Sequence, residues 1–189
     1  MKKNILTSTL AVVILFGTTA FTTLKDKKVE IKNSTITWVG KKVTGKHTGN
    51  ITLKEGFLMM KGKELRGGEF VMDMTTINVT DLEGGSKGKL EGHLKSDDFF
   101  GVDNHPTATL KFTGFSGEDG MYTVIGDLTI KGQTHPVRFD LKIDGKTATT
   151  SLKVNRTKYG IKYGSGSFFD NLGDKAINDE FELNVELQF

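Results

Sequence analysis

The chain has 189 residues, with 36% hydrophobic and 26% charged residues, and 26 lysines and arginines against 23 aspartates and glutamates give a net charge of +3. This composition suits one folded domain, is too polar for a polytopic membrane protein, and lacks the basic stripe of a nucleic-acid-binding protein. Because the chain has no cysteine, disulfide scaffolds, thiolate zinc sites and cysteine nucleophiles are excluded.

Residues 1–20 have the layout of a secretory signal peptide. A basic start at residues 1–3 precedes a mostly apolar stretch over residues 5–16, and small residues run to Ala20, after which we expect cleavage. Twelve apolar residues are too few for a relaxed bilayer span. We therefore expect a periplasmic or secreted protein whose mature chain has no stable membrane span. Residues 21–33 are predicted to be an N-terminal lead-in.

From residue 29 onward, the pattern of alternating apolar and polar residues predicts β-strands almost throughout. The clearest run is residues 181–189, where every second residue is apolar. Period-two alternation over nine residues indicates a half-buried strand and is incompatible with an amphipathic helix. Glycine-containing turns at residues 131–133 and 144–146 join neighbouring strands and predict hairpins.

One segment breaks the strand pattern. Around residues 86–96, Leu90 and Leu94 recur at helical spacing, which predicts a short helix. Charges of both signs between residues 82 and 104 place this segment on the surface or across an end of the fold. No linker or repeat divides the chain, so residues 34–189 are predicted to form one domain.

The strand pattern predicts an all-β fold. Many antiparallel strands with one apolar face each close either as a sandwich or as a barrel. A nine-residue strand spans about 30 Å, and long strands of even pattern favour an extended antiparallel β-barrel of about eight strands. The interior of such a barrel has room for one slender ligand.

The chemistry-bearing residues do not form a recognisable catalytic or metal motif. The adjacent pair Asp97-Asp98 is predicted to end the helix in a turn, because neighbouring residues point in different directions. Neither a phosphate loop nor a nucleophile elbow is present. We therefore predict no metal, no cofactor and no enzymatic activity. Metal-ligand spacing is missing for each of the four histidines, which are His47, His93, His105 and His135.

Three blocks of the sequence resemble signature segments of the YceI-like family, and the final strand fits the end of that family's domain. Together they cover nearly all of residues 34–189 in the same order. The chain departs from the family at Asn155, where an acidic residue is common, and at residues 103–105. The matching blocks are residues 93–100 (HLKSDDFF) followed by Pro106, residues 126–137 (GDLTIKGQTHPV), and Asn155-Arg156 with Tyr159-Gly160-Ile161.

The resemblance implies a lipocalin-like, extended antiparallel β-barrel that is exported to the periplasm. It further implies that the barrel lumen binds a long isoprenoid lipid, of the polyprenyl phosphate or isoprenoid quinone type, for transport or storage. A lumen lined by Phe and Met suits such a hydrocarbon.

In a soluble barrel the apolar face of each strand points inward. The apolar side chains on these faces are therefore predicted to line the lumen or simply to fill it. Two polar residues of the matching blocks, His93 and Arg156, are candidates for head-group contacts, and a buried ion pair or a loop-fixing hydrogen bond is the alternative for each. The predicted lumen residues are Trp38, Phe70, Met72, Met74, Leu110, Phe112, Phe139, Leu141, Phe181, Leu183 and Val185.

Two other classes of function stay open at this stage. Alternating strands and a terminal Phe189 after a signal peptide are also found in outer-membrane β-barrels. The chain has only four Tyr and Trp residues, which are few for the aromatic girdles of such a barrel. A lipid-modifying enzyme would need a polar cluster inside the lumen. The sequence also leaves open a homodimer.

Overall fold

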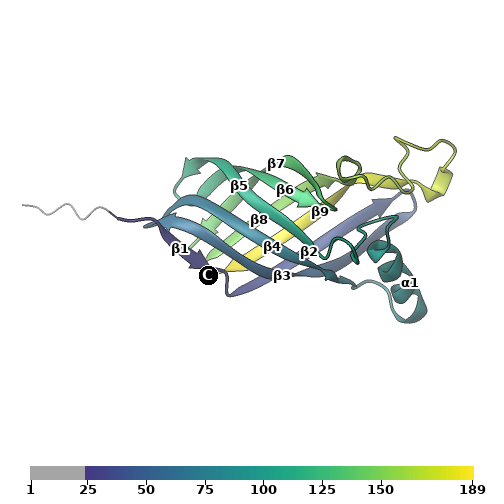
Figure 1. Cartoon of the computed structure of the whole chain (residues 1–189), viewed down its shortest axis with the longest axis horizontal. Helices are drawn as coiled ribbons and strands as arrows, with labels where there is room; N and C mark the ends of the chain where they lie inside the picture. Colours follow the sequence, from purple (N-terminus) through teal and green to yellow (C-terminus); the bar gives the residue numbers. More distant parts are fainter. Residues whose placement is uncertain (1–23) are drawn as a thin grey trace, which may run out of the picture.

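The computed structural model describes residues 24–189, which form nine strands, one α-helix and two short 3₁₀ helices (Figure 1). The signal peptide predicted over residues 1–20 lies outside the described residues. In chain order the elements are β1 (Lys27–Glu30), β2 (Asn33–Lys42), β3 (Gly45–Lys61), β4 (Glu64–Val79), α1 (Gly84–Lys95), β5 (Thr107–Glu118), β6 (Met121–Ile130), β7 (Gln133–Asp144), β8 (Thr147–Asn155), η1 (Arg156–Tyr159), η2 (Gly173–Lys175) and β9 (Ile177–Gln188).

Strands β2 to β9 form a closed antiparallel barrel. Each of these strands pairs with the next along the chain, and β9 pairs with β2, so an up-and-down sheet closes on itself. The predicted all-β barrel of about eight strands is confirmed, and so is its short helix, which runs from Gly84 to Lys95. This helix is the one α-helix of residues 24–189, and it is neither long nor apolar enough to cross a membrane.

The ninth strand, β1, lies inside the predicted lead-in. It pairs with residues 57–60 of β3, beyond the point where β2 leaves that strand. The strand pattern that begins at residue 29 thus extends into the predicted lead-in. Val29 and Ile31 pack against the hydrophobic core and hold this segment to the barrel.

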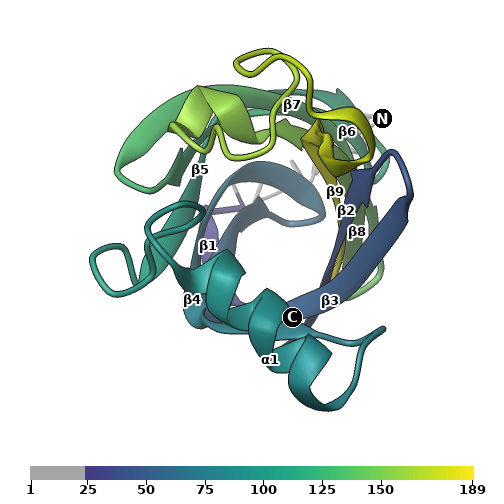
Figure 2. The same ribbon diagram turned by 90° about the vertical axis from the view of Figure 1, so that its right-hand side faces the viewer.

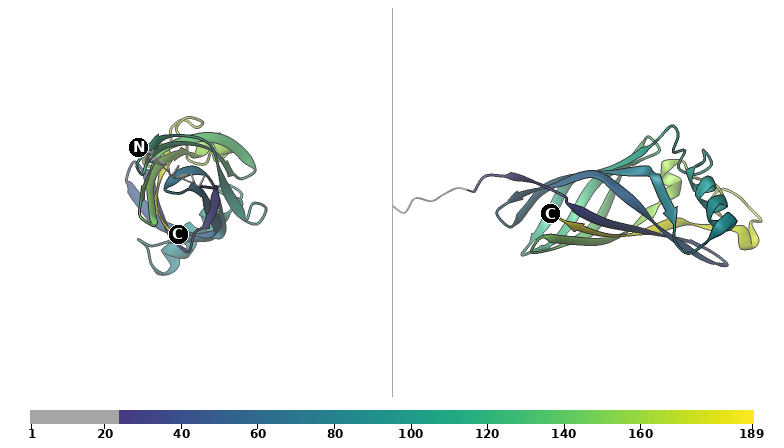
Figure 3. Two further views of the ribbon diagram at one scale, coloured as in Figure 1. Left: turned by 90° about the vertical axis from the view of Figure 1, so that its left-hand side faces the viewer. Right: turned by 90° about the horizontal axis from the view of Figure 1, so that it is seen from below.

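The two ends of the barrel differ. The mouth end carries the β2–β3 turn, α1 and the connection between β8 and β9, and α1 lies across one side of the opening (Figure 2). The opposite, closed end carries the β3–β4 turn and the C-terminus (Figure 3). There Leu58, Leu65, Tyr122 and Val124 are buried, and the backbone N–H of Leu65 donates to the Tyr122 hydroxyl at 3.2 Å. These side chains plug the closed end.

The lone tryptophan lies against a glycine on the neighbouring strand. Trp38 on β2 is paired with Gly49 on β3. A Cβ atom on Gly49 would lie 2.0 Å from the carbonyl oxygen of Asn78 and 2.3 Å from Cζ2 of Trp38. The missing side chain of Gly49 therefore allows the indole to lie along the barrel wall.

Replacement of Gly49 by alanine should lower the free energy of unfolding by about 2 kcal/mol, because the wall must move to admit the methyl group. The emission of Trp38, which reports on this contact, should shift in the same variant. Gly40→Ala is the matched control, because a Cβ at Gly40 on β2 meets nothing within 4 Å. Chemical unfolding followed by fluorescence measures both effects, and equal stability of the two variants would contradict the argument.

Candidate ligand-binding cavity

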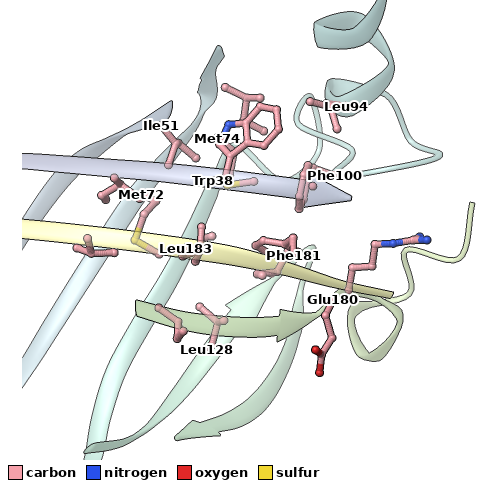
Figure 4. A pocket seen from close by; sticks show the side chains of 18 of the residues that line it. Trp38, Ile51, Met72, Met74, Leu94, Phe100, Leu128, Glu180, Phe181 and Leu183 are labelled. Atoms are coloured by element: carbon pink, nitrogen blue, oxygen red, sulfur yellow. The ribbon is translucent and has the colours of Figure 1, made fainter. Parts of the chain in front are cut away.

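An internal cavity of about 230 Å³ extends into the barrel from the mouth end. It is far larger than the 10–15 Å³, roughly, that one water molecule needs. All eight strands of the barrel, α1 and the turn after α1 contribute to its wall, which is almost entirely carbon. Six of the thirteen phenylalanines line it. Figure 4 shows Trp38, Met72 and Leu183 directed into this space from three different strands.

All the side chains that alternation selects for the lumen line this cavity. Several of them, such as Met72 and Leu183, are only half-buried although they point inward, because the cavity leaves them partly uncovered. That a ligand touches them stays a prediction. The eleven are Trp38, Phe70, Met72, Met74, Leu110, Phe112, Phe139, Leu141, Phe181, Leu183 and Val185.

Other lining residues were not selected from the sequence. Ile36 on β2 and Ile51 and Leu53 on β3 face the cavity. Phe99 and Phe100 lie in the turn after α1, where no periodicity applies. The only sequence feature that could have identified Phe99 and Phe100 as lining residues is that this apolar pair directly follows two charged residues. Asp97 and Asp98 are exposed, whereas Phe99 is buried and Phe100 half-buried, so the turn directs its apolar pair into the barrel.

Helix α1 covers the mouth and is tied to β4 by two side-chain hydrogen bonds, in which Glu91 accepts from the Val79 N–H and Lys87 donates to Asn78, both at 2.8 Å. Leu90, His93 and Leu94 line the cavity, yet no residue of α1 is fully buried. The helix contains four glycines, and a Cβ on any of them would meet nothing within 4 Å. Because glycine lowers helix stability by about 1 kcal/mol relative to alanine, and no packing contact requires it here, α1 is a cover of low intrinsic helix stability.

His93 makes edge-to-face contacts with two aromatic rings at the mouth. Its ring centroid lies 4.4 Å from that of Tyr163 and 5.2 Å from that of Phe99. Its Nε2 atom is buried, and no atom of residues 24–189 is hydrogen-bonded to it. A buried nitrogen without a partner is costly. A polar group of a ligand in the cavity could satisfy it, so His93 stays a candidate for head-group contact.

Arg156, at the end of β8, is 2% exposed and uses its guanidinium to fix the β8–β9 connection. Its Nη1 donates to the carbonyl oxygens of Ile161 and Tyr163, both at 2.9 Å. Its Nε and Nη2 donate to the carbonyl oxygens of Asn178 and Ile177, both at 3.0 Å. Four of its five N–H donors are therefore engaged by backbone. This geometry matches the loop-fixing alternative for Arg156.

A carboxylate accompanies this guanidinium. Nη2 of Arg156 lies 3.7 Å from Oδ1 of Asp179, whose other oxygen accepts a hydrogen bond from the Ser167 hydroxyl at 2.5 Å. Burial lowers the pKa of Arg156, and the Asp179 charge opposes that shift. Burial acts to raise the pKa of Asp179, but the hydroxyls of Ser165 and Ser167 and the charge of Arg156 hold it below its ordinary value. Asp179 is therefore ionised at neutral pH.

The charged side chains of the cavity wall lie at its mouth. Lys41 pairs with Glu182 at 2.7 Å, and Nδ1 of His47 lies 2.9 Å from a carboxylate oxygen of Asp81. Lys42 also lines the opening. Within residues 24–189, no three His, Asp or Glu side chains come together as a metal ion would require. The cavity thus combines an apolar depth with a charged rim.

A closed antiparallel barrel with a carbon-lined cavity open at one end defines the class of small barrel proteins whose interior has room for one ligand. Within that class, the family model for the YceI-like domain matches residues 28–189. The chain therefore belongs to the YceI-like family, as the three sequence blocks predicted.

Curated relatives align over part of the chain. A UPF0312 protein of Staphylococcus epidermidis is 36% identical over 84 residues, which is 39% of this chain and 47% of that protein. A UPF0312 protein of Photorhabdus laumondii is 28% identical over 114 residues, or 59% of each chain. The alignments thus span about half the length of these relatives.

Solved structures share the fold over most of the chain. BcnA of Burkholderia cenocepacia superposes with a TM-score of 0.65 at 19% identity, over 82% of this chain and 94% of its own. A polyisoprenoid binding domain from Saccharophagus degradans, implicated in plant cell wall breakdown, gives a TM-score of 0.56 at 14% identity, over 87% of this chain and 97% of its own. At these identities the likeness shows the shared fold.

Replacement of Arg156 by glutamine should lower the free energy of unfolding by about 3–5 kcal/mol, because it leaves buried carbonyls and Asp179 without their partner. Arg156→Lys retains the charge but not the fork of donors, and should recover little of the loss. Without Arg156 the pKa of Asp179 rises. The loss in free energy of unfolding caused by Arg156→Gln should therefore be largest at neutral pH, where Asp179 is ionised. This loss should become smaller as the pH falls through the pKa of Asp179. Urea unfolding at pH 7 and pH 4 measures it, and full recovery by lysine would contradict the hydrogen-bonding role.

Replacement of Gly88 and Gly92 by alanine should stabilise α1 by about 1 kcal/mol each, because the added methyl groups meet no atom within 4 Å. Hydrogen exchange should show greater protection of the α1 amides. Gly84→Ala is the control, because Gly84 has a φ of +54° that alanine adopts only with strain, and this variant should lose protection. Unchanged exchange in the double variant would show that α1 is held by contacts other than its own helix propensity.

Proposed function

We propose that this protein binds one long isoprenoid lipid, with the tail in the cavity and the polar end at the mouth, and carries or stores that lipid in the periplasm. One observation carries the proposal, which is the separation of a carbon-lined depth from a charged mouth in the same cavity. A hydrocarbon chain matches the first region and a polyprenyl phosphate or quinone head the second. The export route rests on the signal peptide expected at residues 1–20.

The energetics of burial support a hydrocarbon ligand. Each buried methylene contributes about 0.8 kcal/mol, so four isoprene units contribute on the order of 16 kcal/mol. That exceeds the roughly 4–15 kcal/mol that association costs in lost freedom. Met72 and Met74 supply flexible, polarizable side chains to the wall, which can adapt to the methyl branches of such a tail.

The comparisons support the same class of ligand. The Saccharophagus degradans structure that shares this fold is described as a polyisoprenoid binding domain. The carbon lining of the cavity described above suits such a ligand. The membership of this chain in the YceI-like family adds to that support.

A lipid-modifying enzyme is less well supported. The charged residue packed deepest at the mouth, Arg156, is engaged by backbone carbonyls, and Asp97 and Asp98 face solvent. His93 contacts aromatic rings rather than a carboxylate or hydroxyl that could activate it. These contacts favour binding without catalysis.

An outer-membrane barrel is also less well supported. Such barrels carry an apolar band outside and polar residues inside. Here the arrangement is reversed, as β9 illustrates with apolar side chains in the cavity wall and polar ones outside. The outward residues of β9 are Glu182, Asn184, Glu186 and Gln188.

Replacement of Leu183 by tryptophan should reduce binding of an isoprenoid lipid at least tenfold, because the larger side chain occupies the cavity. Asn184→Trp is the matched control, since its side chain points outward from the same strand and should leave binding unchanged. Native mass spectrometry with added decaprenyl phosphate or a long-chain quinone measures both, and lipid extraction identifies any molecule that co-purifies. The same spectra report a monomer or a homodimer. Equal binding by the two variants, or a failure of the wild type to bind either lipid, would contradict the proposal.

A further inference from the structure

Two neighbouring segments at the mouth end display apolar side chains to solvent. We call them the mouth rim, and they are residues 41–46 at the β2–β3 turn and residues 162–176 in the β8–β9 connection (Figure 2). The exposed fractions are 65% for Val43, 49% for Tyr163, 47% for Phe168 and 50% for Phe169. A cluster of large apolar side chains exposed to water marks a surface that contacts another protein or a membrane.

The mouth rim is a single, internally braced surface. The backbone N–H of Val43 donates to the carbonyl of Ala176 at 3.3 Å, which ties the turn to the connection. The N–H groups of Phe168 and Phe169 both donate to the carbonyl of Ser165, at 3.1 and 3.0 Å. The two phenylalanines are therefore held on a tight turn that presents them to solvent. Arg156 fixes the same connection to β9 through Tyr163 and Ile177.

Positive charge accompanies the apolar groups. Residues 41–46 and 162–176 contain five lysines and two aspartates, whereas the whole chain has 26 basic and 23 acidic residues. Three of these lysines flank Val43, and one of the three, Lys41, is paired with Glu182. Nζ of Lys162 lies 4.6 Å from the centroid of the Phe168 ring. Lysine beside exposed aromatic and aliphatic groups is typical of segments that enter the head-group region of an anionic bilayer.

The closed end of the barrel provides an internal comparison. It also exposes apolar side chains, with Phe115, Met121 and Ile125 on β5 and β6. The turn beside them carries Glu118 and Asp119, while Lys142 and Arg138 are the cross-strand partners of Met121 and Ile125. This patch lies at the end opposite to the cavity mouth (Figure 1). The mouth rim thus combines exposed apolar groups, net positive charge and the cavity opening.

We propose that the mouth rim docks the protein on an anionic lipid bilayer. Val43, Phe168 and Phe169 enter the interface between head groups and acyl chains, while the lysines lie against lipid phosphates. Docking in this orientation sets the cavity mouth against the membrane, so that a hydrocarbon tail passes between bilayer and barrel with little exposure to water. The transfer of a tail rests on the proposed function, whereas the docking itself does not.

Vesicle sedimentation tests the docking, with the chain from Phe21 onward, which contains every strand of the barrel. Wild-type protein should sediment with vesicles of phosphatidylglycerol and phosphatidylethanolamine, and at least tenfold less with pure phosphatidylcholine or in high salt. The F168S/F169S variant and the K42Q/K46Q variant should each lose at least tenfold in affinity for the anionic vesicles. M121S/I125S, which removes exposed apolar groups from the closed end, is the matched control and should bind as the wild type does.

Unchanged sedimentation of F168S/F169S, or an equal loss in M121S/I125S, would overturn the proposal, as would wild-type binding that ignores lipid charge. Thermal melts verify that all variants are folded, which is expected because the replaced side chains are exposed. The two functions are separable. F168S/F169S should still bind decaprenyl phosphate in detergent solution by native mass spectrometry, whereas Leu183→Trp should still dock on vesicles but bind isoprenoid at least tenfold more weakly.

Discussion

Pairing of β2 with β9 closes the sheet, and the rest of the molecule depends on that closure. It removes both free edges from the barrel strands and turns every inward side chain toward one interior. In an eight-stranded barrel that interior is narrow enough to be filled by side chains or to retain space for one ligand. Leu58, Leu65 and Tyr122 fill it at the closed end, and the cavity occupies the remainder.

The mouth is organised by one buried cation. Arg156 engages backbone carbonyls on both sides of the β8–β9 connection and lies beside Asp179. A flexible connection would otherwise leave the opening without a defined shape. Because this connection also carries Phe168 and Phe169, the same contacts define the cavity entrance and the surface around it. The stability of the barrel and the shape of the cavity entrance are therefore coupled at this end.

The distribution of polarity follows one scheme from the interior to the surface. The cavity is lined by carbon, the outer wall carries alternating polar side chains, and lysines gather with exposed aromatic rings at the mouth. Helix α1, at the entrance, contains four glycines that no packing contact requires, which lowers its intrinsic helix stability. An apolar ligand would thus enter the cavity beside a glycine-rich helix, α1, and would be stopped by the tightly packed side chains at the closed end.

The sequence by itself determined the strands and the apolar face of each, because the direction of a side chain on a strand alternates with every residue and needs no distant contact to be known. Strand length only favoured a barrel over a sandwich, and the pairing of β2 with β9 decided it. The family blocks in residues 93–100, 126–137 and 155–161 also carried the family assignment. Only the tertiary structure decided that the interior holds a cavity, that the Arg156 guanidinium donates its hydrogen bonds to backbone carbonyl oxygens, and that Gly49 leaves space for the Trp38 indole. Each of these depends on how closely segments remote in the chain approach one another, and a local pattern of residues does not contain that distance.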